Sequence, residues 1–103
     1  MNECIFCKII SGEIPTHAIY ENEFVIAFPD ISPVAPGHTL IIPKEHHKWF
    51  YEVPGVIANE WFSAAQMIAL KLKEEYVSDY IEMKIIGIDV PHAHMHLIPR
   101  KSN

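Results

Sequence analysis

The longest amphipathic pattern of the chain predicts a helix over residues 56–76. Pro54 and Gly55 stand just before it and mark its start. Apolar residues recur at spacings of three and four, the repeat of one helix face, at Ile57, Trp61, Ala65, Ile68, Leu72 and Tyr76. Further apolar residues widen this stripe: Phe62, Met67, Ala69 and Leu70. So broad a stripe indicates burial on more than one side. A partner subunit is one explanation, and a few exposed apolar residues, which are common, are the other.

Runs of β-branched and aromatic residues predict five strands, over residues 17–21, 24–28, 38–43, 80–86 and 93–99. Residues 29–37, PDISPVAPG, contain three prolines and a glycine and predict a stiff loop. A short helix is expected over residues 4–10, before Ser11-Gly12. The main helix falls between the third and fourth strands. This order predicts an α+β fold, with a five-stranded, mostly antiparallel sheet, one main helix and a short N-terminal helix.

Composition and charge narrow the class of protein. The chain has 103 residues, half of them hydrophobic and 20% charged, which predicts a single globular domain over residues 1–103. No apolar run approaches 18 residues and the first residues do not resemble a signal peptide, so we expect a cytoplasmic protein without a membrane span. The net charge of −5 argues against general nucleic-acid binding. Because the net charge does not attract an anion, a small anionic ligand would need a local pocket of hydrogen-bond donors.

Three of the seven histidines alternate in the segment PHAHMHLIPR at residues 91–100. Side chains of a strand alternate between its faces, so His92, His94 and His96 share one face while the apolar residues between them face the core. Three interpretations compete: a zinc site, chemistry on a phosphate, or a polar face in water. His38, which follows a glycine at the entry to another strand, favours the phosphate interpretation.

Two cysteines, Cys4 and Cys7, have the spacing C-x-x-C. In a cytosolic chain this spacing indicates metal binding or redox chemistry rather than a structural disulfide. The pair precedes every predicted strand, which weighs against a thioredoxin-like motif. The remaining alternative is two free thiols packed as small hydrophobic groups.

Several separated motifs resemble one known family. PHAHMHLIPR resembles the H-x-H-x-H-x-x signature of the histidine triad (HIT) family. Upstream, CIFCKIISGEIP and FVIAFPDISPVAPGHTLIIPKEH resemble its Hint-like, or protein kinase C interacting protein, branch. The resemblance covers about residues 4–100. It implies a HIT-like fold, a homodimer, an AMP-type purine nucleotide as ligand, and hydrolysis of purine nucleoside 5′-phosphoramidates or related nucleotide conjugates. The reaction it implies passes through a nucleotidyl-histidine intermediate and releases a nucleoside monophosphate, with no organic cofactor.

The resemblance also implies roles for individual residues. His94 corresponds to the nucleophile, and His96 and His38 correspond to the contacts of the phosphate. Asp30 corresponds to the residue that binds the ribose hydroxyls, a role that suits a carboxylate on a rigid loop. Without the resemblance, a simple turn-forming residue is the alternative. The purine nucleoside is expected among apolar residues at Phe6, Ile9, Phe28, Ile31 and Leu40.

A structural zinc site is implied by the same resemblance. Its ligands would be Cys4, Cys7, His46 and His92, a donor set that suits zinc. The neighbouring His47 is a competitor for the third position.

The segment before the triad departs from the family pattern. Hint-like proteins carry an asparagine and a Gly-Gln-Ser/Thr segment there, whereas this chain has GIDVP. Gly87 holds the place of the glycine and Asp89 that of the hydroxyl residue, so the leaving-group contacts do not carry over. Two rival functions stay open: a nucleotide-binding or scaffold protein with little turnover, and a triad that is itself a catalytic metal site.

Overall fold

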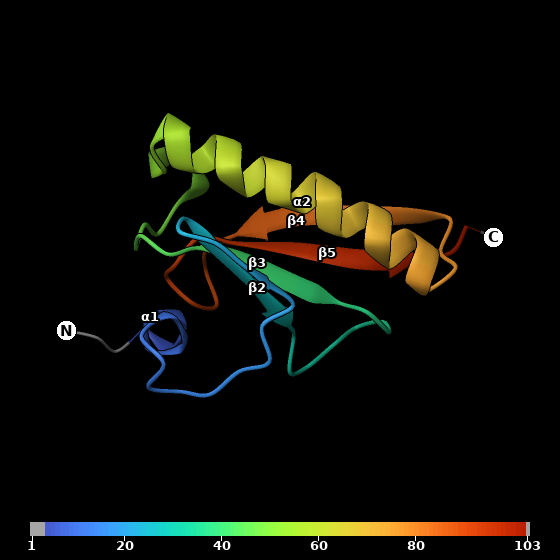
Figure 1. Cartoon of the computed structure of the whole chain (residues 1–103), viewed down its shortest axis with the longest axis horizontal. Coiled ribbons are helices and arrows are strands. Elements are labelled where there is room, and N and C mark those ends of the chain that lie inside the picture. Colours follow the sequence, from blue (N-terminus) through green and yellow to red (C-terminus); the bar gives the residue numbers. More distant parts are fainter. Residues whose placement is uncertain (1–3, 103) are drawn as a thin grey trace.

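The computed structural model describes residues 4–102 and consists of one sheet with a helix on each of its two faces (Figure 1). The elements in chain order are α1 (Ile5–Ile10), β1 (Tyr20–Glu21), β2 (Val25–Pro29), β3 (Thr39–Pro43), the 3₁₀ turn η1 (Phe50–Glu52), α2 (Gly55–Glu75), β4 (Tyr80–Ile86) and β5 (His94–Arg100). The sheet has the order β1-β2-β3-β5-β4. Every neighbouring pair is antiparallel, which confirms the predicted α+β class.

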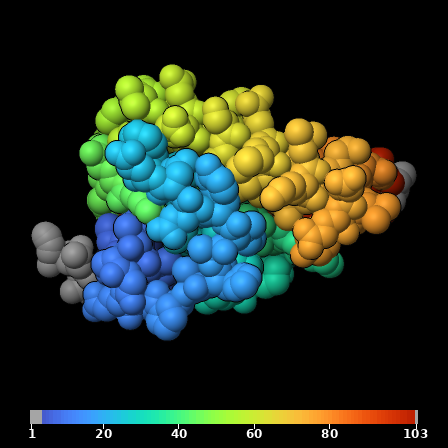
Figure 2. Space-filling model, viewed as in Figure 1, coloured from blue at the N-terminus to red at the C-terminus, as the bar shows by residue number. Residues whose placement is uncertain are grey.

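The two helices cover opposite faces of the sheet (Figure 1). In the space-filling view, the blue segment that leads from α1 to β2 lies beside α2, which is yellow (Figure 2). No helix within the described residues has the length and apolarity that a membrane crossing requires.

β1 is shorter than the predicted strand over residues 17–21. It pairs with β2 so that Tyr20 lies opposite Ala27. This register would place Ala18 opposite Pro29, which has no N–H to donate, so ladder pairing has to stop there. The turn η1 was not predicted from the sequence pattern, which shows no helical repeat over so few residues.

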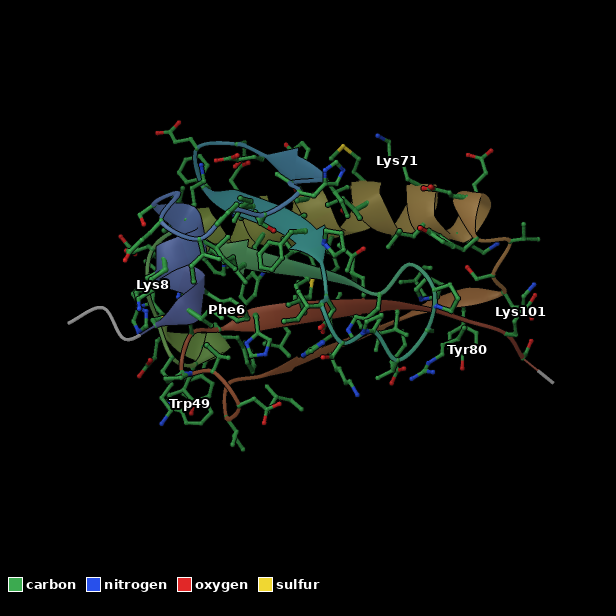
Figure 3. The ribbon with its side chains drawn as sticks, turned by 90° about the horizontal axis from the view of Figure 1, so that it is seen from below. Phe6, Lys8, Trp49, Lys71, Tyr80 and Lys101 are labelled. Carbon is green, nitrogen blue, oxygen red and sulfur yellow. The ribbon has the colours of Figure 1, made fainter. Side chains whose placement is uncertain are left out.

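A small cluster of buried side chains lies under α1. Phe6 points from α1 toward the sheet (Figure 3) and packs with residues of β2 and β3. Its buried partners are Ile26, Phe28, Leu40 and Ile42. Since β2 and β3 are also covered by α2, their side chains are buried on both faces, which explains their nearly unbroken apolar sequence.

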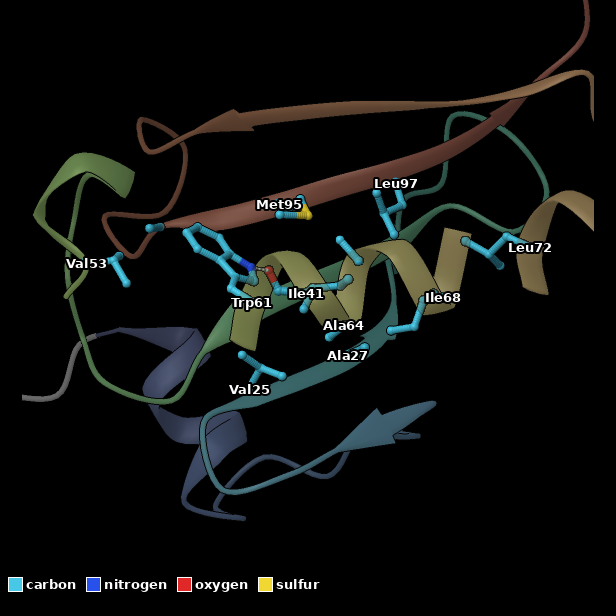
Figure 4. Packing of buried hydrophobic residues seen from close by; sticks show 12 residues of the cluster. Val25, Ala27, Ile41, Val53, Trp61, Ala64, Ile68, Leu72, Met95 and Leu97 are labelled. Atoms are coloured by element: carbon cyan, nitrogen blue, oxygen red, sulfur yellow. Dashed lines mark hydrogen bonds between the residues drawn. The ribbon is translucent and has the colours of Figure 1, made fainter. Parts of the chain in front are cut away.

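The larger core lies between α2 and the sheet (Figure 4). α2 contributes the predicted stripe of Trp61, Ala65, Ile68 and Leu72. β5 contributes Met95 and Leu97, and Ala93 lies just before it; all three are at most 2% exposed. The Nε1–H of Trp61 donates to the carbonyl oxygen of Ile41 at 3.0 Å, which fixes the helix on the centre of β3. This core therefore determines which face of β5 carries its histidines.

Candidate active site and metal centre

His94 and His96 of β5 lie on one face of the sheet, as predicted, and His92, just before the strand, lies on the same side. This is the face that α1 covers. The interpretation as a polar face in water is wrong, because His92 is 0% and His94 is 4% exposed. The reason is α1: its Phe6 ring packs edge-on against both imidazoles, with ring centroids 5.9 Å from His92 and 5.0 Å from His94. Sequence alternation reveals the shared face but not the helix that covers it.

His94 has one ring nitrogen engaged and one free. Its Nδ1–H donates to the carbonyl oxygen of His92 at 2.8 Å. In the neutral ring the lone pair is therefore on Nε2. Among the described residues, no hydrogen-bond partner of that nitrogen is found. His94 thus presents a nucleophilic or basic nitrogen in a fixed orientation.

His38, His96 and Asp30 form a connected network beside it. The backbone N–H of Val34 donates to Nδ1 of His38 at 3.1 Å, so the ring proton of His38 is on Nε2. That Nε2 lies 2.9 Å from Nδ1 of His96 and 3.3 Å from Oδ2 of Asp30. Because His96 accepts at Nδ1, its own proton is on Nε2. The network therefore leaves His96 with an N–H donor that it does not use internally.

The pKa values of the two network histidines are lowered. Burial is the main cause for both His38 and His96, and for His96 the neighbouring His94 and His38 add to it. The charge of Asp30 opposes both shifts. At neutral pH the free protein consequently has neutral imidazoles here, and they act as N–H dipoles rather than as full positive charges.

A cleft of about 300 Å³ opens beside His94. Its walls are mostly apolar, and its charged or titratable lining residues are Asp30, Asp89, His94 and His96. The predicted nucleoside residues all lie on it: Phe6, Ile9, Phe28, Asp30, Ile31 and Leu40. Sequence reasoning missed several lining residues, for which neither spacing nor residue type gave a signal: Ile5, Ile14, Pro15, Thr16 and Val90.

His38 does not line this cleft but supports His96 from behind. It faces a larger hollow of about 520 Å³ on the α2 side, whose walls include His17, Lys71 and Tyr76. Asp30 borders both hollows. Because His94 borders only the smaller cleft, we place the candidate active site there.

Four further side chains converge at the N-terminal end of α1. Nδ1 of His92 lies 3.5 Å from Sγ of Cys4, 3.6 Å from Sγ of Cys7 and 3.1 Å from Nδ1 of His46. Cys7 Sγ is 3.1 Å from the same His46 nitrogen. Zinc bonds of about 2.0–2.3 Å in a tetrahedron imply ligand atoms roughly 3.3–3.8 Å apart. The two distances from His92 to sulfur fall in this range and the two distances to His46 are about 0.2 Å shorter, so a small outward movement of His46 would fit the group to a zinc ion.

The surroundings of the cluster also fit a cation. Nε2 of His92 lies 2.8 Å from the carbonyl oxygen of Pro43, to which it donates, and this leaves the lone pair of Nδ1 turned toward the cysteines. Without a cation, burial lowers the pKa of His92 to about 4 and raises that of Cys7 to about 11, the latter also through Cys4. His47 is turned away, with Nε2 2.6 Å from a carboxylate oxygen of Glu45, so His46 is the residue that joins the cluster.

The triad itself does not converge on one point. Among the described residues, His92 groups with the cysteines, while His96 groups with Asp30 and His38. Both facing nitrogens of that second group are already hydrogen-bonded to each other. This geometry gives no support to a catalytic metal held by the three alternate histidines.

Comparison with known proteins agrees with the fold and the motifs. The model of the HIT domain family matches residues 11–103. A crystal structure of a HIT family member from Bacillus subtilis superposes with a TM-score of 0.92 at 42% identity, covering 99% of this chain and 76% of that one. The adenosine 5′-monophosphoramidase HNT1 of Saccharomyces cerevisiae is 40% identical over 95% of this chain and 63% of its own length. The adenylylsulfatase HINT3 of Arabidopsis thaliana is 34% identical over 97% of this chain and 53% of its own length.

One solved relative contains a metal. A zinc-bound histidine triad family protein from Mycobacterium smegmatis superposes with a TM-score of 0.89 at 33% identity, covering 98% of this chain and 77% of that one.

Proposed function

Since this chain belongs to the HIT family, we propose that it hydrolyses purine nucleoside 5′-phosphoramidates or related nucleotide conjugates and releases the nucleoside monophosphate. The observation that carries the proposal is His94, which lines a mostly apolar cleft and whose Nε2 has no hydrogen-bond partner among the described residues. The relatives named a monophosphoramidase and an adenylylsulfatase support nucleotide hydrolysis at the level of the family.

The proposed reaction has two displacements at phosphorus. In the first, the Nε2 lone pair of His94 attacks, an N–P bond forms, and the bond from phosphorus to the leaving group breaks; an amine leaving group takes up one proton as it departs. In the second, water attacks the nucleotidyl-histidine, an O–P bond forms, and the N–P bond breaks. His94 is regenerated and one proton is released, so the sum is conjugate plus water to nucleoside monophosphate plus amine.

The residues around His94 have distinct proposed roles. The carbonyl of His92 holds the Nδ1 proton of His94 and stabilises the positive charge that the ring gains on attack. The free N–H of His96 donates to a non-bridging phosphate oxygen, with His38 behind it as the group that orients it. Asp30 accepts from the ribose hydroxyls, and the apolar walls of the cleft receive the purine.

The test is the variant His94→Ala with adenosine 5′-phosphoramidate as substrate. Loss of the nucleophile should lower kcat by more than about 10³-fold, whereas His17→Ala, an exposed histidine outside the cleft, should leave it unchanged. Acid-quenched wild type should show a mass increase of one nucleotidyl group, which His94→Ala lacks. Undiminished turnover by His94→Ala would reject the mechanism. Tight monophosphate binding with negligible wild-type turnover would favour the scaffold alternative.

We further propose that Cys4, Cys7, His46 and His92 hold a structural zinc ion. Bound there, the ion would supply a cross-link between α1 and the start of β5, without contact with the reacting phosphate. Metal analysis should find one zinc per chain in wild type and none in Cys4→Ala, with residual activity in that variant. Reversible loss of activity on chelation while the fold persists would instead favour a catalytic metal.

The final parts of the proposal concern assembly and location. Apolar side chains are exposed on α2 and on the edge strand β4, among them Phe62 at 51%, Leu70 at 72% and Ile86 at 48%. We propose that they pack against a second copy of the chain in a homodimer, which sedimentation of wild type and of Leu70→Glu would test. Two free cysteines in a metal-binding arrangement suit the reducing cytoplasm.

A further inference from the structure

Two carboxylates line the cleft, those of Asp30 and Asp89, and they differ in their surroundings. Asp30 has partners: Oδ2 is 3.3 Å from Nε2 of His38, and Oδ1 accepts from the N–H of Ser32 at 2.8 Å. Asp89 lines the same cleft from the loop between β4 and β5. Within residues 4–102, no hydrogen bond or ion pair to its carboxylate is found, and its side chain is exposed. Asp89 therefore places an uncompensated negative charge at the mouth of the cleft.

The loop that carries Asp89 is anchored on both sides. At Gly87 an added Cβ atom would clash with the carbonyl oxygen of Lys48, so the chain packs closely there and tolerates no side chain. On the other side, Val90 packs against the cluster under α1, and its carbonyl oxygen accepts from the N–H of His92 at 2.7 Å. Asp89 lies between these two anchors, which keep its position relative to β5 and His94.

The walls of the cleft assign a place to the leaving group. Phosphorus has to lie near Nε2 of His94, and in an in-line displacement the leaving group departs on the opposite side. The apolar floor, formed by Phe6, Phe28 and Leu40, is taken by the purine. The leaving group consequently extends toward the open mouth, where Asp89 stands. Among the described residues that line the cleft there is no lysine or arginine to offset this charge.

We propose that Asp89 selects nucleotide conjugates whose leaving group carries a positive charge. The favoured class is a phosphoramidate of a diamine or of a basic side-chain amine, in which an ammonium group lies a few bonds beyond the scissile P–N bond. Leaving groups with a carboxylate, phosphate or sulfate are disfavoured by repulsion. This inference rests on the proposed function, because it concerns which conjugate that same site accepts.

The experiment uses three adenosine 5′-phosphoramidates of matched length, formed from 1,3-diaminopropane, butylamine and 3-aminopropanoate. Their tails are cationic, neutral and anionic, while the scissile bond is the same. For the wild type we expect kcat/KM to fall in this order, by about tenfold for each unit of charge, the size of a Coulomb interaction over roughly 6 Å in a partly exposed site. The preference should shrink as sodium chloride is raised, because the charge is exposed.

Four variants separate charge from structure. Asp89→Asn keeps the shape and should bring the three kcat/KM values within about twofold of one another, and Asp89→Ser should do the same. Asp89→Glu should restore the order. Glu23→Gln, an exposed carboxylate outside the cleft, changes net charge equally and should leave the wild-type order intact.

Each outcome decides the inference. An unchanged order in both Asp89→Asn and Asp89→Ser, or an equal loss for all three substrates, would overturn it. If wild type hydrolyses none of the three, the proposed function fails, and dissociation constants of the same compounds then decide about Asp89. In that case the selectivity is supported if wild type binds the cationic compound more tightly than the other two and Asp89→Asn does not. Equal binding of all three compounds by wild type refutes it.

Discussion

The end of α2 contains a conflict between residue type and backbone conformation, and it leads to a quantitative prediction. The N–H of Ser78 donates to the carbonyl of Lys73 at 3.0 Å, and the N–H of Val77 lies 3.3 Å from the carbonyl oxygen of Glu74. Together these bonds form a Schellman motif, which requires a left-handed residue and usually has glycine there. Here that residue is Val77, with φ of +48°. A β-branched side chain is strained in this conformation.

The expected gain from Val77→Gly follows from three contributions. Relief of the left-handed conformation stabilises the native state by about 1–2 kcal/mol. Glycine makes the unfolded chain more flexible, which costs about 0.4–1 kcal/mol. Loss of side-chain burial contributes little because Val77 is 72% exposed. The net result is a stabilisation of about 1 kcal/mol, which for a domain of this size raises Tm by about 4 °C.

The assay is thermal and urea unfolding of the wild type, Val77→Gly and the control Val34→Gly. Val34 is also an exposed loop valine, at 61%, but its φ is not positive. The control should therefore lose about 0.5–1 kcal/mol, through the unfolded chain alone. A Tm of Val77→Gly at or below the wild-type value, or equal shifts in both variants, would refute the argument from backbone strain.

The remaining predictions concern the core, the network and the metal. Trp61→Phe should reduce the free energy of unfolding by about 0.5–1.5 kcal/mol in urea titration, since it removes the hydrogen bond from the indole to the Ile41 carbonyl; no change would mean that this bond is replaced. Burial lowers the pKa values of His38 and His96, so the native state binds fewer protons at these rings than the unfolded chain does. The stability that depends on these neutral rings is therefore present above about pH 6.5 and is lost on acidification. His38→Gln should flatten the decline of Tm at acidic pH, and His17→Gln should not. Chelation of the proposed zinc should lower Tm and weaken binding of adenosine monophosphate several-fold by calorimetry, because Phe6 reaches the cleft from α1; unchanged affinity would show that α1 stays in place without metal.

The sequence predicts best what local patterns determine. The period-two alternation of β5 correctly separates His94 and His96 from Met95 and Leu97, because a slip of one residue would break the core. The repeat of α2 is equally reliable, since its stripe meets the sheet. The histidine network is a different case. It depends on the hydrogen bond from the Val34 N–H to the His38 ring and on the hydrogen bond from His38 to His96 of β5. Neither contact has a signature in residue spacing.

The direction of side chains in loops is the other feature that the sequence does not predict. After Pro43 the chain contains His46 and His47 side by side, and residue type cannot separate them. The structure separates them through Glu45, which pairs with His47 and leaves His46 facing the cysteines. Likewise, the burial of the histidine face depends on α1, which lies far from β5 in sequence. Contacts of this kind follow from packing rather than from any pattern within one segment.

The two sites share so much structure that we expect each to affect the other. α1 has only six residues, too few to be stable as an isolated helix, so its position depends on what holds it. Cys4 and Cys7 tie it toward His92, and its Phe6 contacts the rings of both His92 and His94. The carbonyl of His92 in turn fixes the tautomer of His94. A metal that orders His92 and α1 would therefore also order the wall of the cleft and the nucleophile. By thermodynamic linkage, a nucleotide that binds this cleft should raise the affinity for zinc by the same factor that zinc raises the affinity for nucleotide.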